Sequence, residues 1–181
     1  IMRSGAGTSD DIWVSGSIGD AALALAIYNA GDSDRMAAPE YAALLDRLQR
    51  PEPRVALGQK LVGIATAAID ISDGLAADLG HLCHASAIGA NIETENIPLS
   101  AAARDCLGAP SYGMDIVIGG GDDYELLFTA PPSQAADVTQ AAERSGCAVT
   151  RIGRANAKNR VRFAAADGHE IEIKKPGWAH F

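Results

Sequence analysis

Two aspartates and a serine lie close together where a β-branched stretch gives way to a helix-forming one. The segment Ala68–Asp78 places Asp70, Ser72 and Asp73 just before Gly74, and alanine and leucine positions follow. Carboxylate and hydroxyl oxygens are hard ligands that suit Mg²⁺, which proteins commonly hold through one or two carboxylates together with substrate phosphates. The start of a helix also favours anions. The segment therefore points to a metal–phosphate complex, although serine and aspartate before a helix are also ordinary caps.

A second acidic group follows three glycines, in the segment Gly119–Glu125. The glycines permit close approach of the backbone to a ligand, or simply a tight turn. If the chain is extended from Asp122 onward, Asp122 and Tyr124 share one face while Asp123 and Glu125 share the other. Asp122 and Asp123 would then not bind the same ligand. The non-functional alternative is that these acidic residues simply precede a strand.

Two further groupings also have a functional and an ordinary interpretation. Asp78, His81 and His84 follow one another at about one helical turn, a spacing that can bind a metal but is equally common on solvated helix faces, which we favour. Trp178 near the end of the chain either offers a stacking platform for a flat cationic ring or anchors the C-terminus. The sequence contains no GxxxxGK[ST] phosphate loop, GxSxG elbow or HRD kinase sequence.

Periodicity and turn residues predict alternating strands and helices that must position these groups. Strands are expected over 11–15, up to Asp70, and over 88–93, 124–129, 148–152, 161–164 and 170–173. Helices are expected over 20–30 (capped by Asp20), 39–50, 55–65, from Leu75, over 100–106 (capped by Ser100) and over 133–145. Because strands alternate with helices but hairpins are expected to close the chain, an α+β or mixed α/β fold is favoured over a purely parallel sheet.

Composition and charge restrict the class of protein. The 181 residues suffice for one domain, and a hydrophobic content of 48% is typical of a globular protein. A net charge of −8 argues against nucleic acid or an anionic membrane as the main partner. Three widely spaced cysteines favour reduced thiols in the cytoplasm, without a zinc site. Because the chain starts with Ile1, we expect its first segment, residues 1–7, to be the tail of a longer protein.

Three motifs in order resemble the bacterial thiamine-monophosphate kinase family: Asp70-Ile-Ser-Asp-Gly-Leu-Ala-Ala-Asp-Leu79, Gly120-Gly-Asp-Asp-Tyr-Glu-Leu-Leu-Phe128 and Gly177-Trp-Ala-His-Phe181. The opening Arg3–Ala6 and the stretch Asp10–Asp20 are similar to that family's junction between its two halves. The resemblance therefore implies that residues 1–19 are a lead-in from the N-terminal domain and that residues 20–181 form the main domain, the C-terminal ATP/substrate domain. The resemblance implies an α/β/α layered domain with a mixed sheet, like the C-terminal domain of aminoimidazole-ribonucleotide synthetase. It further implies that the N-terminal half, which carries most of the Mg²⁺-binding aspartates, is absent here.

The resemblance also assigns roles to residues. It implies that Asp70 and Asp73 bind Mg²⁺, that Ser72 contacts ATP and that Arg3 meets the nucleotide phosphates. Asp122 stands where the family usually has glutamate and is expected to touch the thiamine substrate. Trp178 stands where the family has an aromatic residue that packs on the thiamine substrate.

The implied reaction is direct in-line transfer of the γ-phosphoryl group of ATP to thiamine monophosphate, which forms thiamine diphosphate. Mg²⁺ ions would screen the two anions, and no protein nucleophile is needed. The full-length enzyme is expected to be a cytoplasmic homodimer, and this chain alone is expected to be inactive. The alternatives are another ATP-using synthetase of the same superfamily, a non-catalytic domain that binds Mg²⁺–nucleotide, and an α+β domain whose acidic turns are only caps.

Overall fold

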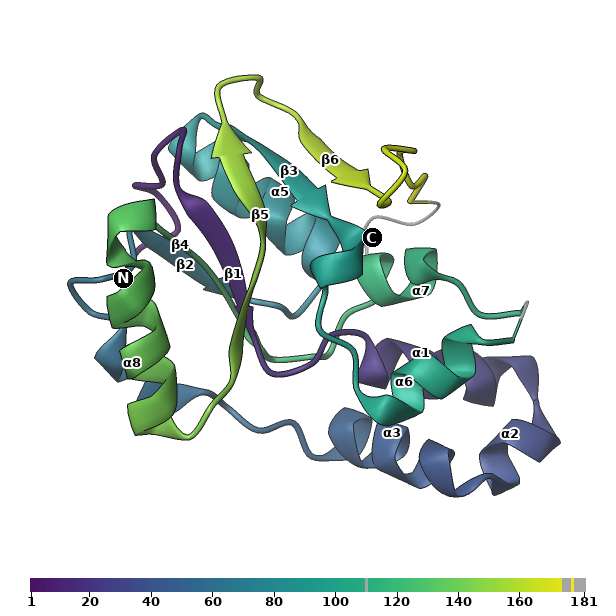
Figure 1. Ribbon diagram of the computed structural model, residues 1–181. Coiled ribbons are helices and arrows are strands. Elements are labelled where there is room, and N and C mark those ends of the chain that lie inside the picture. Colours follow the sequence, from purple (N-terminus) through teal and green to yellow (C-terminus); the bar gives the residue numbers. More distant parts are fainter. Residues whose placement is uncertain (110, 174–176, 178–181) are drawn as a thin grey trace.

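A six-stranded mixed sheet forms the centre of the molecule in a computed structural model that describes residues 1–109, 111–173 and 177 (Figure 1). The strand order is β2-β4-β1-β5-β3-β6. All neighbouring strands are antiparallel except β3 and β6, which pair in parallel. The strands are β1 (Asp11–Ser15), β2 (Ala67–Asp70), β3 (Gly89–Glu93), β4 (Leu126–Ala130), β5 (Val149–Asn156) and β6 (Val161–Ala164). The predicted fold class, with its mixed sheet, is confirmed.

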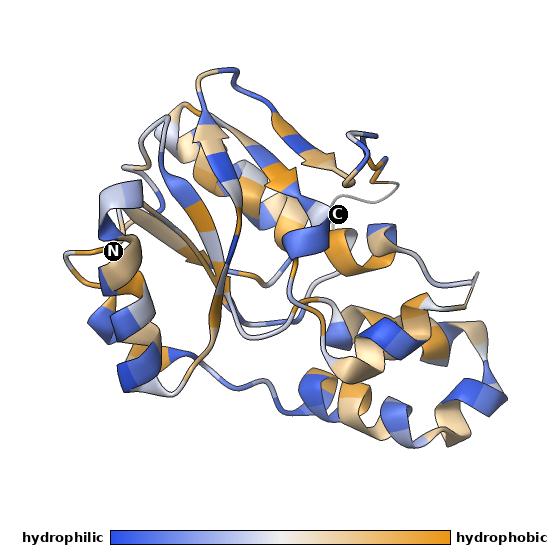
Figure 2. Ribbon diagram, in the orientation of Figure 1, coloured by the Kyte–Doolittle hydropathy of each residue, from blue (hydrophilic) through white to orange (hydrophobic). Residues whose placement is uncertain are grey.

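Helices cover both faces of this sheet because each strand sends alternate side chains to opposite sides. In β4, Leu127 packs into a core with α5 (Leu75–Ser86), while its neighbour Phe128 packs into a second core with α4 (Val55–Lys60) and α8 (Ala135–Ser145). Figure 2 shows hydrophobic and hydrophilic positions interspersed along β3 and β5, whereas β4 is mostly hydrophobic because both of its faces pack into a core. The layered arrangement that the family resemblance implies is therefore present.

The remaining helices form a lobe beyond one end of the sheet (Figure 1). Helix α1 packs against α3, α6 and α7. The helices of the lobe are α1 (Asp20–Ala30), α2 (Ser33–Ala37), α3 (Pro39–Gln49), α6 (Ala101–Leu107) and α7 (Met114–Gly119). Short 3₁₀ turns lie at Thr94–Asn96 and Pro132–Gln134. Within the described ranges, none of the helices is long and apolar enough to span a bilayer.

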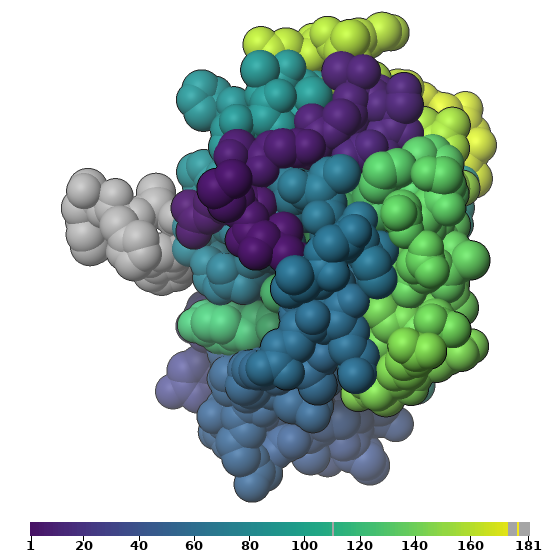
Figure 3. All heavy atoms as spheres, turned by 90° about the vertical axis from the view of Figure 1, so that its left-hand side faces the viewer, coloured from purple at the N-terminus to yellow at the C-terminus, as the bar shows by residue number. Residues whose placement is uncertain are grey.

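Strand β1 lies inside the sheet, between β4 and β5. Its residues Ile12 and Val14 are fully buried in the same core as α5. The stretch before it runs along the free edge of β2, where the Ala68 N–H donates to the Met2 carbonyl at 3.0 Å, and Figure 3 shows this segment on the face beside α8. The expected lead-in over 1–19 thus contributes an interior strand to the main domain.

The predicted caps differ in their outcome. Ser100 caps α6 as expected, since its Oγ accepts the Ala103 N–H at 3.0 Å. Asp20 does not cap α1, because Gly19 occupies the cap position with a φ of 89° and Asp20 is the first helical residue. The carboxylate of Asp20 instead accepts the hydroxyl groups of Ser17 and Ser100, at 2.7 and 2.6 Å.

Several predicted elements are shorter than expected. The helix expected over 55–65 ends at Lys60, and Gly63 then adopts a φ of 83° in a turn. The helix expected over 133–145 begins at Ala135, after a 3₁₀ turn. The strand expected over 170–173 is reduced to an isolated bridge between Glu170 and Ala164.

Of the expected closing hairpins, direct pairing of β5 with β6 is wrong, whereas the chain after β6 does fold back onto it through the antiparallel bridge of Ala164 and Glu170. Strands β5 and β6 are consecutive in the sequence, yet β3 lies between them and pairs with both. The loop between β5 and β6 therefore passes over the end of β3, a strand from an earlier part of the chain that occupies the position between them.

Candidate functional site

The two acidic motifs meet at the end of the β2–β4 pair. The Ile71 N–H donates to the Glu125 carbonyl and the Tyr124 N–H donates to the Ile71 carbonyl, both at 2.8 Å, and the Asp122 N–H donates to the Ser72 carbonyl at 3.0 Å. These bonds continue the pairing of the two strands past their ends. They bring together two turns that are distant in the sequence. Neither motif alone indicates this contact.

Glycines permit this close approach of backbone to backbone. A Cβ on Gly121 would lie 2.2 Å from the Ser72 carbonyl oxygen, and a Cβ on Gly74 would lie 2.8 Å from the Gly119 carbonyl oxygen. Gly74 also has a φ of 125°, which side chains rarely adopt. The glycines therefore make room for the backbone of the other turn of this chain and are not needed only for a ligand.

The residues after the glycines are not extended as the sequence analysis assumed. Asp122 and Tyr124 have positive φ values of 67° and 51°, and such conformations cost non-glycine residues about 1 kcal/mol or more each. The predicted division of faces nevertheless holds, since Asp122 and Tyr124 line a pocket while Asp123 and Glu125 are buried. Strained residues that are held in place by their surroundings cluster at functional sites.

The pocket has a volume of about 810 Å³, the size of a small-molecule site. Helix α1 contributes mostly apolar residues to its lining, and the two turns contribute polar ones, here called the polar wall. The lining residues are Ala21, Ala22, Leu25, Ala26, Asn29, Ser72, Asp73, Asp115, Ile116, Gly119, Gly120, Gly121, Asp122, Tyr124 and Gly177. Two of the predicted site residues from the first motif and one from the second thus share one cavity.

Negative charge is concentrated at the polar wall. The pKa of Tyr124 is raised, first by the charge of Asp122, then by burial, and further by the charges of Asp70 and Asp73. Asp70 is exposed at the end of β2 and is not among the lining residues, but its charge acts on the same phenol. Among residues 1–109, 111–173 and 177, no lysine, arginine or histidine forms an ion pair with any of these three aspartates.

The chemistry of this donor set fits a hard divalent cation. Like charges around one phenol repel each other, and a bound cation relieves that repulsion. Carboxylate oxygens together with the Ser72 hydroxyl are ligands that suit Mg²⁺ rather than softer metals.

Asp78, which the sequence analysis treated as part of a helix face, organises the first turn. Its side chain is 2% exposed, and its Oδ2 accepts the backbone N–H groups of Ser72, Asp73 and Gly74 at 3.0, 3.0 and 3.1 Å. Burial raises its pKa, and these three hydrogen bonds oppose the rise. Since the three amides point to Asp78, they are not available to an anion in the pocket.

His81 lies near the same turn. Ligand atoms of Asp73, Asp78 and His81 lie within 4.8 Å of one another, whereas His84 does not join this group. His81 is exposed, and one carboxylate oxygen of Asp78 is already engaged by three amides. We therefore retain the interpretation of a solvated helix face for the two histidines.

The structure does not bring Arg3 to the pocket. Its carbonyl oxygen lies 3.4 Å from the Ser86 hydroxyl, at the C-terminal end of α5, and its side chain is exposed. At 1.5 Å per residue, α5 separates that end from the Asp73 turn by about 16 Å. Trp178 lies outside the described residues, but Gly177 before it lines the pocket and donates its N–H to the Gly119 carbonyl at 3.1 Å.

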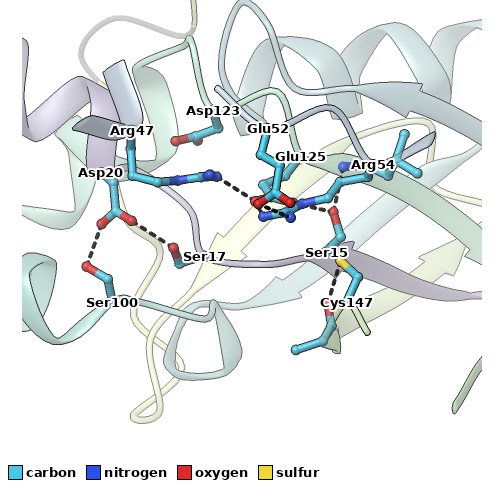
Figure 4. A network of polar contacts seen from close by, with 12 residues as sticks. Ser15, Ser17, Asp20, Arg47, Glu52, Arg54, Ser100, Asp123, Glu125 and Cys147 are labelled. Carbon is cyan, nitrogen blue, oxygen red and sulfur yellow. Dashed lines mark hydrogen bonds and ion pairs between the residues drawn. The ribbon is translucent and has the colours of Figure 1, made fainter. Parts of the chain in front are cut away.

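A buried charge network beneath the site was not predicted (Figure 4). Glu125 is fully buried, and its carboxylate accepts Ser15 Oγ at 2.5 Å, Arg47 Nη2 at 2.7 Å, and Arg54 Nη2 and Nε at 2.6 and 2.8 Å. Hydrogen bonding to Glu125 raises the pKa of Arg54. The network ties α3 and the segment before α4 to the start of β4.

Asp123 is the second buried acid of this region. Both of its oxygens accept the Gly19 N–H, at 2.9 and 3.1 Å. Burial raises its pKa well above the usual value, and the charges of Asp20 and Glu125 add to the rise. Asp123 and Glu125 anchor the strained segment, with Tyr124 between them and Asp122 directly before them. Only the alternation of facing residues after Gly121 could have indicated their burial, and nothing in the sequence indicated their partners.

Comparisons with known proteins agree with this geometry. The family model of the AIR synthase related protein, C-terminal domain, matches residues 8–165. Thiamine-monophosphate kinase of Escherichia coli K12 is 36% identical over 188 residues, which include 100% of this chain and 55% of that protein, and the enzyme of Haemophilus influenzae is 37% identical over 189 residues, with the same shares. The chain therefore spans about half the length of the curated relatives that it matches.

Solved structures are similar over most of the chain. Thiamine-monophosphate kinase from Stenotrophomonas maltophilia K279a has a TM-score of 0.83 and 41% identity, covering 94% of this chain and 54% of that one. The structure of AaThiL complexed with AMPPCP and TMP has a TM-score of 0.78 and 31% identity, covering 99% of this chain and 53% of that one. Escherichia coli HypE, at 17% identity and a TM-score of 0.72, covers 96% of this chain and 52% of its own and shares the fold.

Proposed function

Because the chain belongs to the family of the AIR synthase related protein, C-terminal domain, and resembles thiamine-monophosphate kinases along its whole length, we propose that it forms the C-terminal part of such a kinase's active site. The reaction would transfer the γ-phosphoryl group of ATP to the phosphate of thiamine monophosphate. Its products are thiamine diphosphate and ADP.

The observation that carries this proposal is the pocket of about 810 Å³ whose polar wall carries Asp73 and Asp122, which form no ion pair with a lysine, arginine or histidine among residues 1–109, 111–173 and 177. Asp73 and Asp122 line it from two turns that the fold brings together, and a relative at 31% identity binds AMPPCP and TMP. A scaffold domain has no need for repelling carboxylates gathered beside a cavity of substrate size.

In this proposal Asp70 and Asp73 hold Mg²⁺, and Ser72 contacts ATP. The bound cation screens the negative charges of the two phosphate-bearing substrates, which otherwise repel each other. Asp122 faces the thiamine substrate, whose thiazolium ring is cationic, so its carboxylate favours that ring electrostatically. Trp178 is proposed to contact the thiamine ring, and Arg3, which does not line the pocket, is proposed to contact the nucleotide phosphates outside it.

The pocket suits direct transfer between two bound substrates. Among the described residues, its lining includes no cysteine or histidine that could act as a nucleophile in a two-step transfer. The turns around Ser72 and Asp122 hold their side chains through backbone contacts, so the chain's main task is to orient the reactants.

The remaining parts of the proposal concern the whole protein. We place it in the cytoplasm as a homodimer whose N-terminal half completes the site. Its partners are then ATP and thiamine monophosphate, with no nucleic acid or membrane as partner. Another ATP-using synthetase of the superfamily is the runner-up, and the acceptor in the assay separates the two.

The decisive experiment measures thiamine diphosphate formed from thiamine monophosphate, ATP and Mg²⁺ by the full-length protein, with this chain assayed alongside. We expect product from the full-length protein only. Asp73→Asn in the full-length protein should lower kcat by about 100-fold or more, since it removes a group that screens transition-state charge.

The matched control is Asp137→Asn, an exposed aspartate in the first turn of α8. It should keep wild-type turnover. The urea unfolding midpoints of both variants should stay near that of the wild type, because neither Asp73 nor Asp137 forms an ion pair among the described residues. Unchanged turnover of Asp73→Asn at saturating Mg²⁺ would contradict the assigned role.

A further inference from the structure

Asp78 does not line the pocket, although Ser72 and Asp73 of the turn that it holds do. Its carboxylate is buried, and a single oxygen accepts three consecutive backbone N–H groups, those of Ser72, Asp73 and Gly74. Hydrogen bonds to a charged acceptor are about twice as strong as neutral ones. Three of them on one atom hold the backbone of the turn in one conformation.

The position of Asp78 makes this hold rigid. It lies in the first turn of α5, whose residues Leu75, Leu79 and Leu82 are fully buried in the core. The carboxylate is therefore carried by a packed helix, and the turn that bears Asp73 is fixed relative to that helix.

The same turn contacts the second motif on its other side. While the Ser72 N–H donates to Asp78, the Ser72 carbonyl accepts the Asp122 N–H at 3.0 Å. The residue is thus held through both of its backbone polar groups, and the two pocket-lining turns are linked through it.

We propose that Asp78 is a positioning residue for the cation site: by holding the amides of Ser72, Asp73 and Gly74 it directs the Asp73 carboxylate and the Ser72 hydroxyl toward the pocket. Asp78 contacts neither the cation nor the substrates. The inference rests on the proposed function, since it takes Asp73 as a cation ligand. It adds Asp78 as a residue that sets the affinity of the site for the cation.

Two other roles for Asp78 make different predictions. If it acted only through its negative charge, any carboxylate at position 78 would preserve cation affinity. If it were itself a ligand together with His81, removal of the His81 imidazole would weaken binding as well. The occupied Oδ2 argues against the second role, and substitution at position 78 distinguishes the first.

The test titrates the full-length protein with Mn²⁺ as the probe and follows free Mn²⁺ by electron paramagnetic resonance. Asp78→Asn keeps the shape but removes the charge on the hydrogen-bond acceptor, and Asp78→Glu keeps the charge but displaces it by one methylene. We expect both to weaken Mn²⁺ affinity about tenfold or more. His81→Asn should leave it unchanged.

Asp10→Asn is the matched control. Asp10 is also a buried aspartate that holds a turn, since it accepts the Gly7 N–H at 2.8 Å and the Thr66 hydroxyl at 2.6 Å, but it does not line the pocket. Its substitution should alter the urea midpoint and leave Mn²⁺ affinity within about twofold of wild type.

Wild-type affinity in Asp78→Glu would overturn the inference in favour of a charge effect, and loss of affinity in His81→Asn would overturn it in favour of a ligand role. Absence of Mn²⁺ binding by the wild type would also overturn it. If Asp78→Asn does not fold, Asp78→Glu alone decides the question. A wild-type protein that binds Mn²⁺ but forms no thiamine diphosphate would refute the proposed function and leave this inference standing.

Discussion

Replacement of Glu125 by glutamine tests whether the buried network beneath the pocket stabilises the fold. The substitution keeps the shape of the side chain but removes the charge that Arg47 and Arg54 share. The new amide NH₂ would face the N–H groups of a guanidinium, so at least one donor would point at another donor. The Ser15 hydroxyl, which donates to the carboxylate at 2.5 Å, would also lose a charged acceptor.

The size of the effect follows from burial. Removing one partner of a buried ion pair typically costs about 3–5 kcal/mol, because it leaves an uncompensated charge. The Glu125 side chain is 0% exposed, but those of Arg47 and Arg54 are 23% and 15% exposed, so water recovers part of the loss. We therefore expect the free energy of unfolding to fall by about 3 kcal/mol, at the low end of that range.

Urea unfolding followed by circular dichroism measures this change. With a denaturant dependence of about 1–3 kcal/mol per molar urea, the midpoint should fall by about 1–3 M. Glu52→Gln is the matched control, because Glu52 pairs with the same Arg54 at 2.8 Å but its side chain is 71% exposed. That variant should lose less than about 1 kcal/mol. Equal effects of the two substitutions, or a loss below about 1 kcal/mol for Glu125→Gln, would refute the reasoning from burial.

Two further predictions concern the residues around the pocket. Because the pKa of Asp123 is raised in the folded state, the folded protein binds more protons than the unfolded one between about pH 4 and that raised pKa, and wild-type stability should fall as pH rises through this range. Asp123→Asn keeps an acceptor for the Gly19 N–H and should remove that slope, so melting temperatures of the two proteins from pH 4 to 8 should diverge in favour of the variant; a constant difference would contradict the raised pKa. Gly121→Ala forces a Cβ to within 2.2 Å of the Ser72 oxygen and should destabilise by about 1–3 kcal/mol, measured by urea unfolding. Gly80→Ala in α5, where nothing lies within 4 Å, should instead stabilise by about 0.5–1 kcal/mol, and a similar loss in both variants would argue against steric contact.

Local features were predicted well from the sequence because they depend on neighbouring residues. The Ser100 cap and most helix and strand positions follow from periodicity and turn residues, which act over a few positions. The separation of Asp122 and Tyr124 from Asp123 and Glu125 also follows from alternation along the chain. Errors occurred where a tertiary contact changed a local preference, as at Tyr124, whose left-handed conformation delays the start of β4.

The sequence alone determined the chemical content of this protein: two acidic motifs with hydroxyl and glycine neighbours, a resemblance along the chain, and a mixed α and β composition. The tertiary structure decided which of these groups meet. The insertion of β3 between β5 and β6, the contact of the 72–74 turn with Gly121, and the pairing of Glu125 with Arg47 and Arg54 all join residues far apart in the chain. Such contacts leave no local pattern in the sequence. They depend on burial and on the approach of distant backbone segments in the folded sheet, and not on the identity of neighbouring residues.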